Sequence, residues 1–236
     1  MKQDNAIISD TGRTGTMPEY ATYLFDADGT LLNTVDLVTE SYMHVFDVYK
    51  SLIPDGKTHT KDDVAALMGI PLQAQMEQYF GKLDQQAMDM VCEEYRSYQM
   101  TIYKDSLRLF PGVLETLAQL KAAGKKTGIV TSRKMDTAGL YAEVTGIDRY
   151  IDVYITPEAT DRHKPEPEPV FEAMKRLNAE AGETVFVGDA SFDIQSGNSA
   201  GVHTVFVGWS HNRVSELPVT PTYVISSMDE LIAWGN

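Results

Sequence analysis

The sequence predicts an α/β fold, in which a doubly wound parallel β-sheet carries an all-helical domain inserted after its first strand. In the second half of the chain, short apolar runs alternate with helix-patterned stretches, which is typical of a parallel sheet covered by helices on both faces. Residues 34–105 show helical periodicity only. We therefore expect a core domain formed by residues 20–33 and 106–236, and a helical domain formed by residues 34–105.

The first strand is expected at residues 23–25, where an apolar run ends at Asp26-Ala27-Asp28-Gly29-Thr30 and passes into a loop. A helix is expected from Val35 to about Lys50, because apolar residues recur there at helical spacing. Thr60 and Asp84 are typical N-cap residues and predict the starts of two further helices. We expect no strand in this inserted part.

The remaining strands are expected at residues 127–130, 151–155, 184–187 and 204–207. Helix-patterned stretches separate them, and a short helix closes the chain. Residues 1–19 precede the first strand-like segment, and we expect them to form a flexible tail.

The composition excludes several classes of partner. The net charge is −14 and no basic cluster is present, so neither nucleic acid nor an anionic membrane is an expected partner. No run approaches the roughly 20 apolar residues that a membrane-spanning helix needs. The single cysteine, Cys92, cannot form an internal disulfide, which favours a cytoplasmic location. The sequence leaves open whether the protein is a monomer or a homodimer.

Polar side chains follow the predicted strands at their carboxyl ends, where ligands bind in open parallel sheets. They are Asp26 and Asp28 after the first strand, Thr131 and Ser132 after the second, Lys164 in the loop after the third, and Asp189 and Asp193 after the fourth. Crowded carboxylates raise one another's pKa values unless a cation is present. Oxygen ligands without histidine or cysteine favour a hard ion such as Mg²⁺. The ammonium and hydroxyl donors suit a phosphoryl group.

Each of these segments also has a purely structural explanation. Aspartate and glycine are common turn residues, Thr131 could be a helix N-cap, and a lysine in a Pro/Glu-rich loop is usually solvated. A calcium-binding EF-hand loop is excluded, because its glycine and glutamate positions hold Leu31 and Leu37. The joint occurrence of all four segments, in this order, favours the functional interpretation.

Four segments resemble, in order, the four motifs of the haloacid dehalogenase (HAD) superfamily of phosphotransferases. They are Phe25 to Thr30, Val130-Thr131-Ser132, Lys164-Pro165 and Gly188-Asp189 through Asp193. The resemblance spans about residues 20–235. It implies a Rossmann-like core in which residues 34–105 form the family's helical cap domain.

The resemblance also implies roles for the site residues. Asp26 would be the nucleophile that forms an aspartyl-phosphate, and Asp28 would be the general acid and base. Mg²⁺ would be held by Asp26, the backbone carbonyl of Asp28 and Asp189, with Asp193 in support. The substrate's phosphoryl oxygens would be bound by Thr131, Ser132 and Lys164.

The cap length and the segment Met68-Gly69-Ile70-Pro71-Leu72 resemble the branch of phosphoglycolate phosphatases and pyrophosphate-hydrolysing enzymes. We expect Gly69 to contribute to substrate binding. The expected activity is Mg²⁺-dependent hydrolysis of a small phosphate ester such as phosphoglycolate, with inorganic pyrophosphate as the alternative substrate. The sequence does not identify the substrate.

Four rival functions remain to be weighed. A sugar phosphomutase similar to β-phosphoglucomutase would usually have a histidine at the position of Val38. A dehalogenase would lack Asp28, because it has no alcohol to protonate. A non-catalytic phosphometabolite-binding module would be free to lose Asp26. A zinc hydrolase would need close histidine pairs, and the five histidines are scattered.

Overall fold

The computed structural model describes residues 17–68 and 72–233, which form two compact units. The core unit contains the described residues up to Asn33 and from Arg108 onward, and the cap unit contains the described residues from Thr34 to Leu107. We propose that these units are the two domains, which the sequence placed within two residues of these boundaries. None of the helices in the described ranges is long and apolar enough to cross a membrane.

The core unit is built on a six-stranded sheet in the order β5-β4-β1-β6-β7-β8, and every neighbouring pair is parallel. Its strands are β1 (Thr22–Phe25), β4 (Lys126–Val130), β5 (Val153–Ile155), β6 (Thr184–Gly188), β7 (His203–Val207) and β8 (Tyr223–Ile225). In the centre of the sheet, Phe25 pairs with Ile129 on one side and with Val187 on the other. The three central strands therefore end at the same edge.

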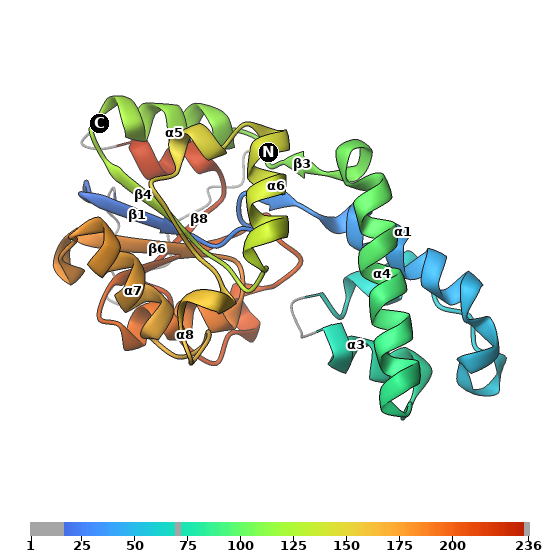
Figure 1. The fold of residues 1–236 in the computed structure, drawn as a ribbon. Helices are drawn as coiled ribbons and strands as arrows, with labels where there is room; N and C mark the ends of the chain where they lie inside the picture. Colours follow the sequence, from blue (N-terminus) through green and yellow to red (C-terminus); the bar gives the residue numbers. More distant parts are fainter. Residues whose placement is uncertain (1–16, 69–71, 234–236) are drawn as a thin grey trace, which may run out of the picture. The chain divides into compact units, whose positions relative to one another are not determined.

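Helices cover both faces of this sheet (Figure 1). One face carries α5 (Val113–Ala122) and α6 (Met135–Thr145), and the other carries α7 (Glu168–Leu177) and α8 (Ser191–Ser199). This distribution follows from right-handed crossovers, which place helices on opposite faces when the strand order reverses at β1. Strands β1 and β6 are buried along their whole length, which explains their continuous apolar sequences.

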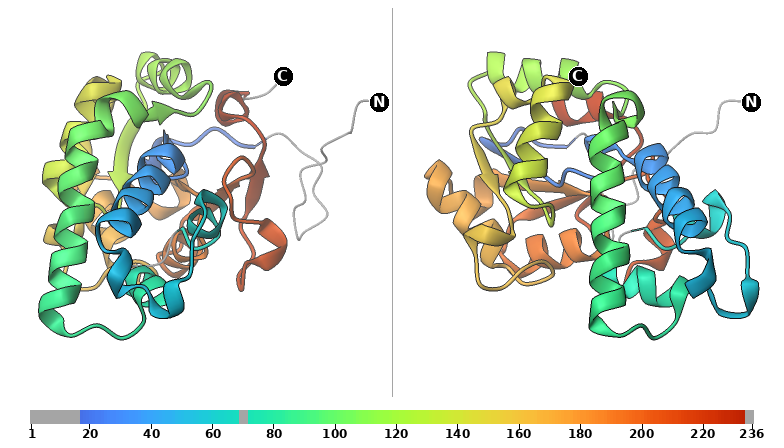
Figure 2. Two further views of the ribbon diagram at one scale, coloured as in Figure 1. Left: turned by 90° about the vertical axis from the view of Figure 1, so that its right-hand side faces the viewer. Right: turned by 45° about the vertical axis from the view of Figure 1, so that its right-hand side comes forward.

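The cap unit is helical. It contains α1 (Val35–Val48), α2 (Lys61–Ala65), α3 (Leu72–Phe80) and α4 (Gln85–Ser106). Helices α1 and α4 pack side by side (Figure 2). Their shared core is aromatic, since the ring of Tyr42 contacts the rings of Phe46, Tyr79 and Tyr95. The Tyr42 hydroxyl, which is fully buried, donates a hydrogen bond of 2.5 Å to the side-chain oxygen of Gln75.

The expected helix starts in the cap unit are confirmed. The Thr60 hydroxyl accepts the backbone N–H of Asp63, and the Asp63 carboxylate accepts the backbone N–H of Thr60 in return. Asp84 accepts the backbone N–H of Ala87 at the start of α4. No strand occurs among the described residues of the cap unit, as expected.

The structure differs from the sequence-based expectation at the smallest elements. The strand expected at residues 151–155 is shorter and spans Val153–Ile155; just before it, the side chain of Asp152 accepts the backbone N–H of Thr127. Strand β8 and the antiparallel pair β2 (Leu32–Asn33) with β3 (Arg108–Leu109) were not expected. They have two or three residues each, too few to show a periodic pattern.

The tail expected at residues 1–19 is only partly covered by the structure. Residues 1–16 lie outside the described residues. Met17 is buried, and the Glu19 carboxylate forms an ion pair with Lys125. Residues 17–19, which the sequence assigned to the tail, therefore lie with the core unit.

Candidate active site

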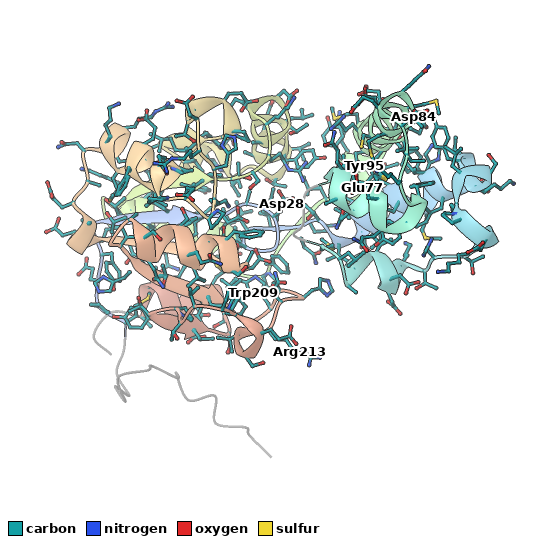
Figure 3. All side chains as sticks on the ribbon, turned by 90° about the horizontal axis from the view of Figure 1, so that it is seen from below. Asp28, Glu77, Asp84, Tyr95, Trp209 and Arg213 are labelled. Carbon is teal, nitrogen blue, oxygen red and sulfur yellow. The ribbon has the colours of Figure 1, made fainter. Side chains whose placement is uncertain are left out.

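The first site segment leaves β1 through a tight loop. The backbone N–H of Asp26 still continues the sheet by donating to the carbonyl of Val187 at 2.8 Å. The carbonyl of Ala27 then accepts the N–H groups of Leu31 and Leu32, which turns the chain back immediately. Asp26 is buried and Asp28 is partly exposed beyond the end of β1 (Figure 3). Both side chains therefore lie at the carboxyl edge of the sheet.

Gly29 makes this loop possible. Its φ of +80° favours glycine, and a Cβ atom there would lie 2.3 Å from Oδ2 of Asp189. The backbone at Gly29 thus lies so close to the Asp189 carboxylate that no residue with a Cβ atom would fit there. The glycine of this motif is required for the contact between the first and fourth site segments.

A buried ammonium group joins three separate segments. Lys164 Nζ donates to Oδ1 of Asp26 at 2.6 Å, to Oδ1 of Asp193 at 2.7 Å and to the carbonyl of Val130 at 3.1 Å. These bonds use all three N–H donors of the ammonium group. The two carboxylates raise the pKa of Lys164, although burial acts in the opposite direction. Lys164 therefore stays charged and fixes the orientation of the Asp26 carboxylate.

The N-terminal end of α8 supplies the second pair of carboxylates. Oδ2 of Asp193 accepts the backbone N–H groups of Asp189 and Ala190 at 3.2 and 3.0 Å. A Cβ atom at Gly188 would lie 2.3 Å from the Cβ of Asp193, so this contact also requires glycine. Asn212, in the loop after β7, donates its side-chain N–H to Oδ2 of Asp189 at 3.1 Å. Backbone and amide donors thus hold both carboxylates in place.

The buried carboxylates of Asp26, Asp189 and Asp193 form a cluster. Each offers one oxygen, and these oxygens lie within 4.8 Å of one another. Burial raises the pKa of the Asp26 carboxyl to about 7, even though Lys164 lowers it. Burial and the neighbouring carboxylates also raise the pKa of Asp189 well above its usual value. Desolvated, mutually repelling oxygen ligands fit a hard divalent cation, which would favour their ionised forms.

Asp28 lies outside this cluster and is paired with Arg133. Nε of Arg133 donates to Oδ2 of Asp28 at 3.0 Å, and Nη2 donates to Oδ1 at 2.7 Å. The guanidinium carbon also lies 4.5 Å from the centre of the Tyr141 ring. Arg133 was not among the site residues expected from the sequence. Its position two residues after Thr131, in the same loop, was the available signal.

The other residues expected to bind the substrate differ in how far they are buried. Thr131 is buried, and its Oγ1 accepts the backbone N–H of Arg133 at 3.1 Å, which leaves the hydroxyl proton as a donor. Ser132 is exposed. Gly69 lies outside the described residues. The structure therefore brings Asp26, Lys164, Asp189 and Asp193 together, with Thr131 buried in the loop after β4 and Asp28 turned toward Arg133.

The loop after β7 was also missed. Besides Asn212, it contains Trp209, which is labelled in Figure 3. The indole N–H of Trp209 donates to the carbonyl of Thr30 at 3.3 Å. This loop therefore contacts both the first and the fourth site segments. No motif in the sequence indicated these contacts.

A doubly wound parallel sheet with this set of carboxylates and a buried lysine at its carboxyl edge defines a hydrolase of the phosphatase class. The chain matches the haloacid dehalogenase-like hydrolases over residues 23–207, and it belongs to that family. The resemblance inferred from the four motifs is thereby confirmed.

Individual relatives agree with this assignment. The chain is 34% identical to the pyrophosphatase PpaX of Halalkalibacterium halodurans, across 91% of this chain and 96% of that protein. A Bacteroides fragilis protein described as a haloacid dehalogenase-like hydrolase has a similar structure, with a TM-score of 0.78, 26% identity and coverage of 90% and 100%. A predicted phosphoglycolate phosphatase of Haemophilus somnus 129PT has a TM-score of 0.79 and 22% identity, with coverage of 92% and 98%, and so shares the fold.

Proposed function

We propose that this protein is a Mg²⁺-dependent phosphohydrolase that cleaves inorganic pyrophosphate or a small phosphate ester such as phosphoglycolate through an aspartyl-phosphate on Asp26. The observation that carries the proposal is the buried Asp26 carboxylate, oriented by Lys164 beside Asp189 and Asp193. The sequence placed a phosphomonoester first. The 34% identity to a pyrophosphatase moves pyrophosphate to first place.

In the proposed reaction, a carboxylate oxygen of Asp26 attacks phosphorus, and the bond to the leaving oxygen breaks. Asp28 gives a proton to that oxygen and then takes one from the water that hydrolyses the aspartyl-phosphate. The Thr131 hydroxyl donates to a phosphoryl oxygen, and Lys164 keeps Asp26 in place. Mg²⁺ held by Asp26, the Asp28 carbonyl and Asp189, with Asp193 in support, would supply positive charge for the carboxylates and the phosphoryl oxygens.

The experiment is phosphate release from pyrophosphate, phosphoglycolate, a sugar phosphate and a nucleoside monophosphate, with and without Mg²⁺. The wild type is compared with Asp26→Asn and with Asp148→Asn, which changes an exposed aspartate of the same unit. We expect turnover that needs Mg²⁺ and falls at least about a thousandfold in Asp26→Asn, because the nucleophile is lost. Asp148→Asn should retain full activity.

Full activity of Asp26→Asn would contradict the proposal. A metal-loaded wild type that releases no phosphate but isomerises a sugar phosphate would instead be a mutase. A protein that binds these compounds without converting them would be a binding module. Because the one cysteine is buried and forms no disulfide, we also propose a cytoplasmic location; the protein would act as a monomer or homodimer without nucleic acid or membrane partners.

A further inference from the structure

The ion pair between Arg133 and Asp28 conflicts with the role proposed for Asp28. Both oxygens of the carboxylate accept hydrogen bonds from the guanidinium group, at 3.0 and 2.7 Å. Both oxygens of Asp28 are therefore occupied by the guanidinium group, and neither can approach a leaving group while this pair is formed. For Asp28 to reach a leaving group, Arg133 must first acquire another anionic partner.

The cationic side chains bonded to the site aspartates differ in what they can offer a substrate. In the described part of the chain, two cationic side chains donate to the site aspartates, and they are Lys164 and Arg133. The ammonium group of Lys164 has used its three donors on protein oxygens. Arg133 lies next to the residue that we assign to the phosphoryl group, and its side chain is 16% exposed. Its guanidinium group is therefore placed to exchange one anionic partner for another.

The surroundings of Arg133 hold it in position for such an exchange. Its backbone N–H is bonded to Thr131 Oγ1, and its guanidinium group lies over the Tyr141 ring. Because the planar fork of arginine matches a carboxylate or a phosphate equally well, either group can take the place of Asp28. The partner must lie beside Asp28, which is where the leaving group has to be for Asp28 to protonate it.

We propose that Arg133 determines specificity by binding an anionic leaving group in exchange for Asp28. The inference rests on the proposed function and names its substrate class: phosphoryl compounds whose leaving group carries its own negative charge. Pyrophosphate, with phosphate as the leaving group, and phosphoglycolate, with a carboxylate on the leaving alcohol, both belong to this class. Substrate binding releases Asp28 from its ion pair, so the acid becomes available only when such a substrate is present.

In the proposed cycle, Asp28 is released from Arg133 and takes a proton from solvent. Asp26 forms a bond to phosphorus, the bond from phosphorus to the leaving oxygen breaks, and that oxygen keeps the electron pair and receives the proton of Asp28. Water then attacks the aspartyl-phosphate and loses a proton to Asp28. Phosphate is released and the Asp26 carboxylate is regenerated. Asp28 returns its proton to solvent and pairs with Arg133 again after the products leave.

The test compares substrates that differ in the charge of the leaving group. Phosphoglycolate is paired with 2-hydroxyethyl phosphate, in which a neutral CH₂OH group replaces the carboxylate, and pyrophosphate is measured beside them. The variants are Arg133→Gln and Arg149→Gln. Arg149 is a matched control, because it also lies over a tyrosine ring, that of Tyr150 at 5.0 Å, but it is exposed.

We expect Arg133→Gln to lower kcat/KM about 100-fold for pyrophosphate and phosphoglycolate, since a charged bidentate hydrogen bond is lost. For 2-hydroxyethyl phosphate the change should stay below about threefold, and Arg149→Gln should change nothing. A loss limited to pyrophosphate would overturn the class that we name. An equal loss for charged and neutral leaving groups would overturn the inference entirely.

A binding measurement separates this inference from the proposed function. In the Asp26→Asn background with Mg²⁺, the non-hydrolysable diphosphate imidodiphosphate should bind about 10- to 100-fold more weakly after Arg133→Gln, whereas inorganic phosphate should bind equally. Unchanged imidodiphosphate affinity would refute the role of Arg133 even if Asp26 proves to be the nucleophile. If Arg133→Gln does not fold, Arg133→Lys is used, and it should show the same substrate-dependent loss to a smaller extent.

Discussion

Replacement of Gly29 by alanine gives the sharpest test of the site's geometry. Alanine at a φ of +80° costs about 1 kcal/mol of conformational energy. In addition, its Cβ would lie 2.3 Å from Oδ2 and 2.6 Å from Cγ of Asp189. Ordinary van der Waals contact begins about 1 Å farther out. Asp189 must therefore move by roughly that distance, away from the position in which Asn212 holds it.

The matched control is Gly124→Ala. Gly124 has a φ of +71°, and a Cβ atom there would meet nothing within 4 Å. Both variants therefore share the backbone cost, which should lower the unfolding midpoint by about 2–4 °C in a chain of this size. Only Gly29→Ala displaces a carboxylate of the cluster. A ligand displaced by about 1 Å should weaken Mg²⁺ binding about 10- to 100-fold.

The assay is thermal unfolding followed over a series of Mg²⁺ concentrations. Because a ligand stabilises the folded state by RT ln(1 + [L]/Kd), the two proteins should diverge as Mg²⁺ rises. At saturating Mg²⁺, Gly29→Ala should lack about 1–3 kcal/mol of the stabilisation that Gly124→Ala retains. An identical Mg²⁺ response in the two variants would refute the reasoning, because Asp189 would then not be constrained by Gly29.

Two further predictions concern pH and the cap unit. Burial raises the pKa of Asp26 from 3.8 to about 7. Between these two pH values, the folded metal-free protein therefore binds more protons than the unfolded chain. Its free energy of unfolding should fall by at most about 1.4 kcal/mol per pH unit as the pH rises through that window. Thermal melts in the presence of a chelator, at about pH 5 and about pH 7, measure this fall in stability. The fall should be smaller in Asp26→Asn and smaller when Mg²⁺ is present. A stability that rises over the same pH range would contradict the prediction. Tyr42→Phe should destabilise the cap unit by about 1–3 kcal/mol, because it leaves the side-chain oxygen of buried Gln75 without its donor. Denaturant unfolding checks this, and an unchanged midpoint would mean that water replaces the lost hydroxyl.

The grouping of the site residues was predictable from the sequence, because parallel strands bring their carboxyl ends to one edge of a sheet. This is why Asp26, Lys164 and Asp193, far apart in the chain, could be assigned to one site before their contacts were known. Strand order and direction, which apolar runs and intervening helices indicate, are enough to place these residues at one edge. The path of each loop is not required.

The pairing of individual side chains was not predictable in the same way. Arg133 bonds Asp28, and Asn212 bonds Asp189, through loops whose course depends on tertiary packing. A basic residue or an amide in a loop is ordinarily solvated, so neither residue stood out. Strand β8 was missed for a related reason, since three residues at the sheet edge show no alternation that distinguishes them from a turn.

The small β2–β3 pair has a consequence for how the family can diversify. Asn33 pairs with Arg108, so the chain leaves the core and returns to it at neighbouring positions. For the core unit, the whole segment between these two residues is therefore one closed loop. The entropic cost of closing such a loop rises only slowly with its length. Segments of very different length or sequence can therefore be exchanged at this junction while the carboxylates at the edge of the sheet keep their positions.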